Sequence, residues 1–252
     1  MNRFFLSLCL APALMLGLLP ALALGQSRAT GEGFDLTASD GIRFLAQEGR
    51  YEAQGAVQLI VGDWVVLADR VVATLDDNQR QMKHLSAEGK VFIQRDTLKA
   101  RVSDLSLRLD QQQLNLRGAP INMQMGDARL VSEGELSFDL ESGSLTLKQA
   151  FLLQAEGLVI SGGAATVATA AGVVKELYVS DGADVERDDI RAAAQNLHYD
   201  REAGKVSLDG AVVLQSGGVL LSSASAVFDL TTGALQLNND PDQRISGALL
   251  SQ

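Results

Sequence analysis

Cysteine is almost absent from this sequence, whose 252 residues include only Cys9. A disulfide bond within the chain is excluded, because a bridge needs two cysteines. Aromatic residues make up only 5%, there are two histidines, and acidic residues outnumber basic ones by 31 to 21. The resulting charge of −10 argues against binding a nucleic-acid backbone, which relies on lysine and arginine. The fold must therefore be held by packing and backbone hydrogen bonds.

Motifs of the common catalytic centres are missing as well. The chain contains no G-x-S-x-G, no H-E-x-x-H and no phosphate-binding loop. His84 and His198 lie far apart, without Cys or Glu at ligand spacing, so we expect no metal and no cofactor. Most acidic residues occupy turns, where Asp is favoured for its own hydrogen bonds. We therefore expect no enzyme, and a sugar-cleaving pair of carboxylates stays a minor alternative.

The N-terminus has the layout of a secretory signal. It contains one basic residue, Arg3, then an apolar run at 4–19 and a small-residue end near Ala23. We predict a cleaved signal peptide at 1–25, which exports the chain. An uncleaved anchor is the alternative, because 4–24 is long enough to span a bilayer.

The rest of the chain consists of short alternating segments separated by turns. In 121–147 apolar side chains recur at every second position, and turns interrupt them at 126–127 and 141–143. A period of two indicates strands with one apolar face. Both turns return at intervals of about 30 residues, a spacing typical of stacked repeats. The first recurs near Asp63, Asp96, Asp127, Gly157, Asp188 and Gly217, and the second near Asp76, Asp110, Asp139, Thr169, Asp200 and Asp229.

This repeat predicts one all-β body, because stacked units bury their apolar faces on their neighbours. We expect an elongated, twisted β-jellyroll or solenoid-like stack of about six ~30-residue units. The stack is predicted at 42–237, between a leader at 26–41 and a tail at 238–252.

Two places depart from the regular pattern. Near Ser103 and Asp104 the apolar phase shifts by one residue, which predicts a β-bulge. In the unit at 148–177, the middle is nearly all Gly, Ala and Thr, so packing there should be thin. This composition fits a hinge, a weak break between two halves, or a close approach of two layers.

Several recurring motifs resemble the LptA/OstA-like family of periplasmic lipopolysaccharide-transport proteins. They are GAV at 55–57, LADRV at 67–71, HLSAEGKV at 84–91, and FDLxxGxL at 138–145 and 228–235. The resemblance is clearest at 50–147 and continues to 237. It implies a twisted antiparallel β-jellyroll, open along one side, whose apolar interior carries lipid A acyl chains.

The resemblance also implies a non-enzymatic periplasmic carrier or bridge that moves lipopolysaccharide to the outer membrane. Its partners would be lipopolysaccharide, LptC-like and LptD-like proteins joined by strand-edge contact, and further copies of itself head to tail. The residues expected to face the lipid are Val57, Leu59, Val61, Trp64, Val91, Ile93, Leu98, Ile121, Met123, Met125, Leu130, Phe138 and Leu153.

Two other interpretations stay open. One is an LptC-like component that keeps its N-terminal segment as an anchor. The other is a purely structural exported β-solenoid with a dry core. The inward positions rely on Val, Leu, Ile and Met, so the interior could be partly empty and accept acyl chains, or it could be completely filled.

Overall fold

The computed structural model describes residues 26–31, 33–78, 80–238 and 246–249. Strands make up 77% of the described residues, which contain no helix, and this confirms the predicted all-β class. In this part of the chain there is accordingly no helix long and apolar enough to cross a membrane. The predicted signal peptide at 1–25 lies outside the described residues.

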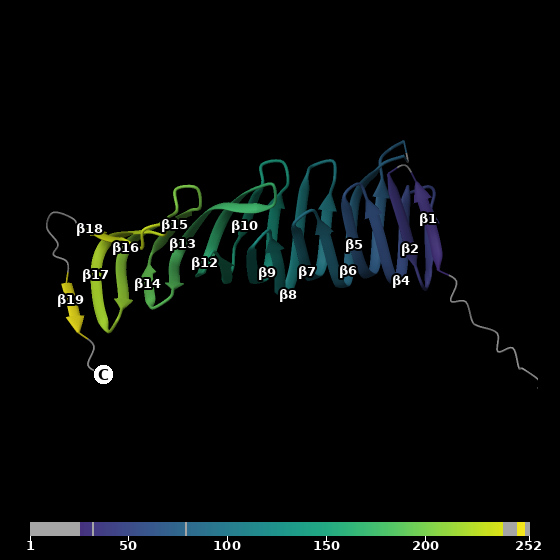
Figure 1. Ribbon diagram of the computed structural model, residues 1–252. Coiled ribbons are helices and arrows are strands. Elements are labelled where there is room, and N and C mark those ends of the chain that lie inside the picture. The colour runs from purple at the N-terminus through teal and green to yellow at the C-terminus, as the bar shows by residue number, and fades with distance from the viewer. Residues whose placement is uncertain (1–25, 32, 79, 239–245, 250–252) are drawn as a thin grey trace, which may run out of the picture.

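The strands follow one another along the sequence. They are β1 (Ser27–Gly31), β2 (Phe34–Ala38), β3 (Gly41–Leu45), β4 (Arg50–Val61), β5 (Trp64–Leu75), β6 (Met82–Arg95), β7 (Leu98–Arg108), β8 (Gln113–Met125), β9 (Ala128–Asp139), β10 (Ser144–Leu147), β11 (Phe151–Ala155), β12 (Leu158–Ala170), β13 (Val173–Arg187), β14 (Ile190–Ala194), β15 (Asn196–Asp200), β16 (Lys205–Ser216), β17 (Val219–Asp229), β18 (Leu235–Asn238) and β19 (Ser246–Leu249). In the described chain all 19 strands join one sheet. They form an elongated stack that runs from β1 at one end to β19 at the other (Figure 1).

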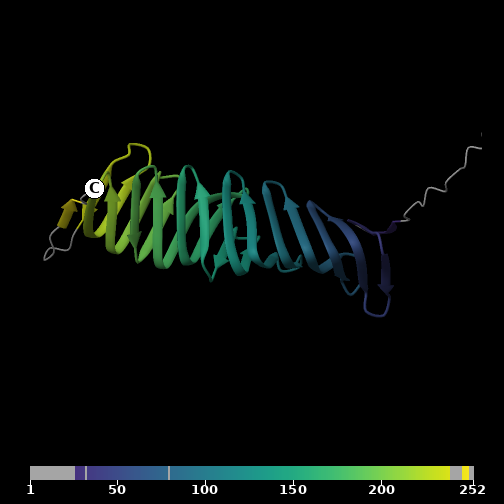
Figure 2. The ribbon, with the colours of Figure 1, turned by 90° about the horizontal axis from the view of Figure 1, so that it is seen from below.

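The sheet is folded into two layers, because the two halves of a long strand pair with different neighbours. In β9, residues 129–132 pair with β11, whereas 136–139 pair with β10. In β13, residues 183–187 pair with β14, whereas 176–179 pair with β15. We call layer A the layer of β2, β11, β14 and β19 with the adjoining strand halves, and layer B that of β3, β10, β15 and β18 with the other halves. Figure 2 shows the successive strands crossing the long axis of this stack.

Bulges at the corner between the layers explain the GAV and GKV motifs. The pairing of β6 with β7 shifts between Glu88 and Val91, where Gly89 and Lys90 have φ angles of 76° and 47°. Glycine adopts a positive φ at little cost, and a Cβ at Gly89 would lie 2.6 Å from Oδ2 of Asp69. The motif thus bends the strand, and the side chain of the valine that follows, Val91, lies in the core. The segment at 55–57 does the same in β4 with Val57.

Both predicted turn series lie at strand ends. Residues 62–63 join β4 to β5, for example, and 109–112 join β7 to β8. The predicted bulge is also confirmed, because the pairing of β7 with β8 shifts between Arg101 and Asp104. The regular spacing of about 30 residues therefore reflects one passage of the chain from layer A to layer B and back.

The structure differs from the prediction at both ends of the stack. The segment predicted as a leader at 26–41 contains β1 and β2, and β2 pairs with β4 from Phe34 opposite Val61. Its short alternation buries Phe34, Leu36 and Ala38, so the sheet begins before residue 42. In the predicted tail at 238–252, β19 pairs with β17.

The small-residue region lies within continuous strand pairing. β12 pairs with β11 and β10 on one side and with β13 on the other. A Cβ at Gly162 would lie 2.5 Å from Cγ1 of Val179 and 2.8 Å from the carbonyl oxygen of Gly182. The small side chains therefore let the backbone of the neighbouring strand β13 approach closely at the corner of β12.

Candidate functional site

The residues predicted to face inward all lie in the interior between the layers. Each has at most 9% of its surface exposed, and all belong to one continuous apolar cluster. All of them except Phe138 come from layer A. Whether they contact lipid stays a prediction.

Layer B contributes a second inward surface, of which the sequence prediction included only Phe138. Leu85, Leu107, Leu114, Leu116, Leu136 and Leu145 are among its fully buried side chains. The signal was present, because these leucines alternate with polar residues just as the layer A residues do. In this state the two inward surfaces pack on each other, so acyl chains would need the layers to separate.

Opposite the bulged corner, the strand ends and turns of the two layers meet along one side of the stack, which we call the seam. Near its N-terminal part lies a hollow of about 410 Å³, which we call the mouth. Layer A lines it with Trp64, Arg95 and Leu98, and layer B with Phe138 and the turns at 140–143 and 169–172. The Arg95 guanidinium lies 5.2 Å from the centre of the Trp64 ring. Asp96, which pairs with Arg95 at 3.9 Å, and Glu141 also line the mouth, so its apolar wall has a rim of one cationic and two acidic side chains.

Further along the seam, four side chains form a cluster across the two layers, which we call the clasp. Arg201, just after β15 of layer B, donates through Nη1 to Oδ1 of Asp127 and through Nη2 to Oδ2, both at 2.9 Å. Its Nη2 also lies 2.9 Å from Oε1 of Glu156, whose Oε2 accepts a 2.9 Å hydrogen bond from the Tyr199 hydroxyl. Asp127 and Glu156 lie in consecutive turns of layer A.

The contacts of the clasp shift the pKa values of Asp127, Arg201 and Tyr199. The hydrogen bond from Arg201 holds the pKa of Asp127 below its ordinary value. The same bond raises the pKa of Arg201. Burial raises the pKa of the Tyr199 hydroxyl, and the hydrogen bond to Glu156 raises it further, so this group stays a donor at neutral pH. The ion pair between Arg201 and Asp127 is therefore fully charged at neutral pH.

We expect the contribution of the clasp to stability to disappear in acid. Because the pKa of Asp127 is lower in the folded state, its contribution is present above its unfolded value of about 3.9 and is lost as pH falls through the folded value. Arg201→Gln should lower the free energy of unfolding at pH 7 by about 1 kcal/mol or less, since half of the Asp127 side chain is exposed. Urea titrations should show this difference shrinking below about pH 4. A difference that persists in acid would contradict an ion-pair origin.

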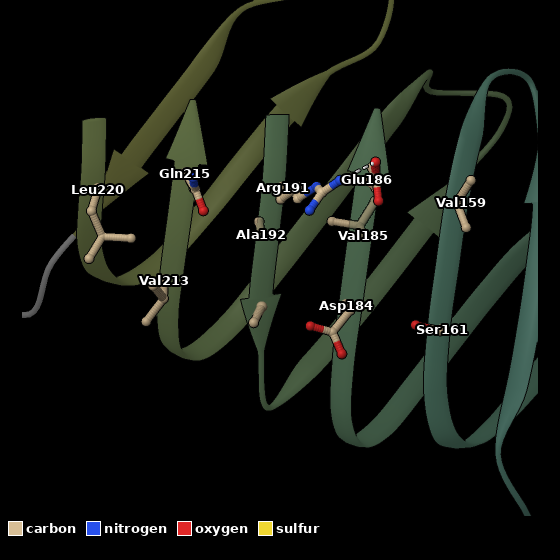
Figure 3. Close-up of a pocket in the computed structure, with 11 residues that line it drawn as sticks. Val159, Ser161, Asp184, Val185, Glu186, Arg191, Ala192, Val213, Gln215 and Leu220 are labelled. Atoms are coloured by element: carbon tan, nitrogen blue, oxygen red, sulfur yellow. Dashed lines mark hydrogen bonds and ion pairs between the residues drawn. The ribbon is translucent and has the colours of Figure 1, made fainter. Parts of the chain in front are cut away.

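Two other hollows lie on outer faces. One, of about 280 Å³, is on layer A, where Glu186 and Arg191 pair at 3.1 Å and Val213 and Leu220 border them (Figure 3). Another, of about 550 Å³, is on layer B beside the stacked rings of Tyr178 and His198, whose centres are 4.1 Å apart. Both are shallow depressions of the sheet surface, separated from the interior by the strands themselves.

Turn acids make local hydrogen bonds, as predicted. Asp76 accepts from the backbone N–H groups of Arg80 and Gln81, which lowers its pKa. Asp139 and Asp229 each accept from the backbone N–H groups two and three positions later in the chain, with the same effect on the pKa. In the described residues no group of three or more His, Cys, Asp or Glu is arranged to hold a metal ion.

A protein-family model matches part of the chain. Residues 38–143, somewhat less than half of the chain, match the family model described as LptA/(LptD N-terminal domain) LPS transport protein. No curated protein sequence matches significantly.

A solved structure provides a second match. It is LptH, described as the LptA homologous periplasmic component of the conserved lipopolysaccharide transport device from Pseudomonas aeruginosa. The match covers 87% of this chain and 96% of that chain, at 11% identity. Its TM-score is 0.23, which is too low for the superposition to support a statement about function. Over residues 38–143, the family match confirms the resemblance noted from the sequence.

Proposed function

We propose that this chain is a lipopolysaccharide-binding component of lipopolysaccharide transport. The premise is the match of residues 38–143 to the family model of LptA and the LptD N-terminal domain. It acts in the periplasm as a carrier or bridge without catalysis. The observation that supports this most is the apolar interior, which runs along the whole stack and meets the seam at the mouth. Acyl chains enter there while the sugar end stays outside the interior, at the seam.

Edge strands supply the proposed contacts with other proteins. β1 and β3 have one pairing partner each at the N-terminal end, and β18 and β19 each pair only with β17 among the described strands. β18 and β19 contain no charged residue, so little opposes the addition of a further strand. We propose that LptC-like or LptD-like proteins, or further copies of this chain, pair with these edges.

A crosslinking experiment tests the lipid-binding interior. A benzoyl-phenylalanine probe in cells at Leu59, Ile93 or Met123, all buried in layer A, should give lipopolysaccharide adducts. The matched controls are Gln58 and Gln124, which neighbour these positions on the exposed face and should give none. Adducts at both sets of positions would indicate adsorption to the outer surface instead.

The close packing of the interior favours a second candidate, a structural β-solenoid with a dry core. This candidate predicts a folded and abundant protein without adducts at any position. Recovery of the N-terminal segment in the mature protein would separate an anchored, LptC-like component from a cleaved periplasmic one.

A further inference from the structure

Among the described residues, the clasp is the place where ion pairs connect the two layers across the seam. Other exposed ion pairs, such as Arg28 with Asp35 and Arg117 with Glu135, join neighbouring strands within one layer. Arg201 instead reaches Asp127, 74 positions away along the chain, in the opposite layer. The clasp therefore contributes to holding the layers together rather than to the stability of one layer.

The clasp separates the mouth from the C-terminal half of the seam. On the mouth side, Thr97 donates to the carbonyl oxygen of Gly172 at 3.3 Å. On the other side, Arg187 donates to the carbonyl oxygen of Leu230 at 3.0 Å. Between these two points, Arg201 ties the turns at 126–127 and 156–157 to layer B. An acyl chain that moves along the interior from the mouth passes the clasp before it reaches Arg187 and Leu230.

Exposure of the clasp makes it able to open. The Arg201 side chain is 23% exposed, Asp127 50% and Glu156 39%, so water can replace each partner. Ion pairs this exposed add little stability, so opening the clasp itself costs little, and separation of the layers then depends on the apolar contacts between them. Tyr199 differs, because it is fully buried and its ring anchors the inner end of the clasp in the core. The clasp thus has a buried inner end at Tyr199 and an exposed outer end, where the ion pairs of Arg201 can break.

We propose that Arg201, Asp127 and Glu156 form a gate on the seam, closed in this structure, which must open before lipid passes from the mouth into the C-terminal half. This inference rests on the proposed function. The gate acts by the equilibrium between joined and separated layers, and a ligand that requires separated layers shifts that equilibrium.

The distance across the seam gives the first test, which needs no lipid. Spin labels are placed by Arg129→Cys in layer A and Lys175→Cys in layer B, both exposed, in a Cys9→Ser background. Pulsed electron resonance should show a narrow distance distribution in the parent protein and a broader, longer one after Arg201→Gln. Asp127→Asn, which weakens the pair from the other side, should act in the same direction. The matched control, Arg117→Gln, removes an arginine pair within layer B and should change nothing.

Crosslinking gives the second test. With the probe at Met123 or at Leu214, which lies in the C-terminal interior, Arg201→Gln should raise the ratio of Leu214 to Met123 adducts several-fold. Equal distance distributions in Arg201→Gln and Arg117→Gln would overturn the gate, and so would separated layers with an unchanged adduct ratio. Adducts absent at every position in every variant would overturn the transport function instead, while the distances still decide whether the clasp holds the layers.

Discussion

Leu116→Asp should abolish folding or leave the protein barely stable. Leu116 lies in β8 in layer B, is fully buried, and pairs with Leu105 on one side and Leu136 on the other. The substitution removes the leucine contacts and places a carboxyl group where no water reaches it, so we expect a loss of more than about 4 kcal/mol. Because each unit of a stack is completed by its neighbours, the damage should spread along the sheet. Far-UV circular dichroism and urea titration measure it.

Asn115→Asp is the control for the same carboxylate one residue earlier. Asn115 lies on the outer face opposite Ser106 and Ser137, where the charge stays hydrated. We expect a change within about 0.5 kcal/mol. Equal losses at 115 and 116 would mean that the inward and outward faces of β8 are wrongly assigned.

Much of the fold could be predicted because it follows local rules. Period-two alternation marks the face of each strand, and Gly or Asp at the turns marks its end. The shift of phase at Ser103 and Asp104 revealed the bulge because the alternation continues on both sides of it. At 34–38 the same alternation covers only one short strand within a polar segment, so the pattern there was too short to suggest that it belonged to the sheet.

The site was harder to predict, because it depends on how the two layers overlap. Alternation says that Met123 faces inward, but not whether the opposite layer fills the space in front of it. The clasp joins residues 74 positions apart, and no local pattern relates Asp127 to Arg201. Asp127 follows Gly126 in its turn just as Asp63 follows Gly62, so local context does not mark it as the acid that pairs across the seam. Sequence alone therefore reveals the interior surface but not its closure.

Trp64 should report the entry of acyl chains at the mouth. It is the only tryptophan of the chain, it is 4% exposed, and it lines the mouth below Arg95. A lipopolysaccharide analogue with a nitroxide on an acyl chain should quench most of the tryptophan emission, because the chain must pass against this ring when the layers separate. Steady-state fluorescence measured against analogue concentration gives the effect. The same analogue with the nitroxide on its sugar should quench less, since the sugar stays outside the seam.

The matched control moves the tryptophan to the outer face of the same strand. In Trp64→Phe with Leu67→Trp, the reporter lies on β5 of layer A at a position that is 40% exposed. Acyl-labelled analogue should leave its emission almost unchanged, because an outward ring contacts solvent and not the interior. Equal quenching at 64 and 67 would mean that lipid adsorbs to the surface of the stack and that the mouth is not its entrance. Strong quenching at 64 alone, in a protein whose seam distance also increases with lipid, would connect entry at the mouth to separation of the layers.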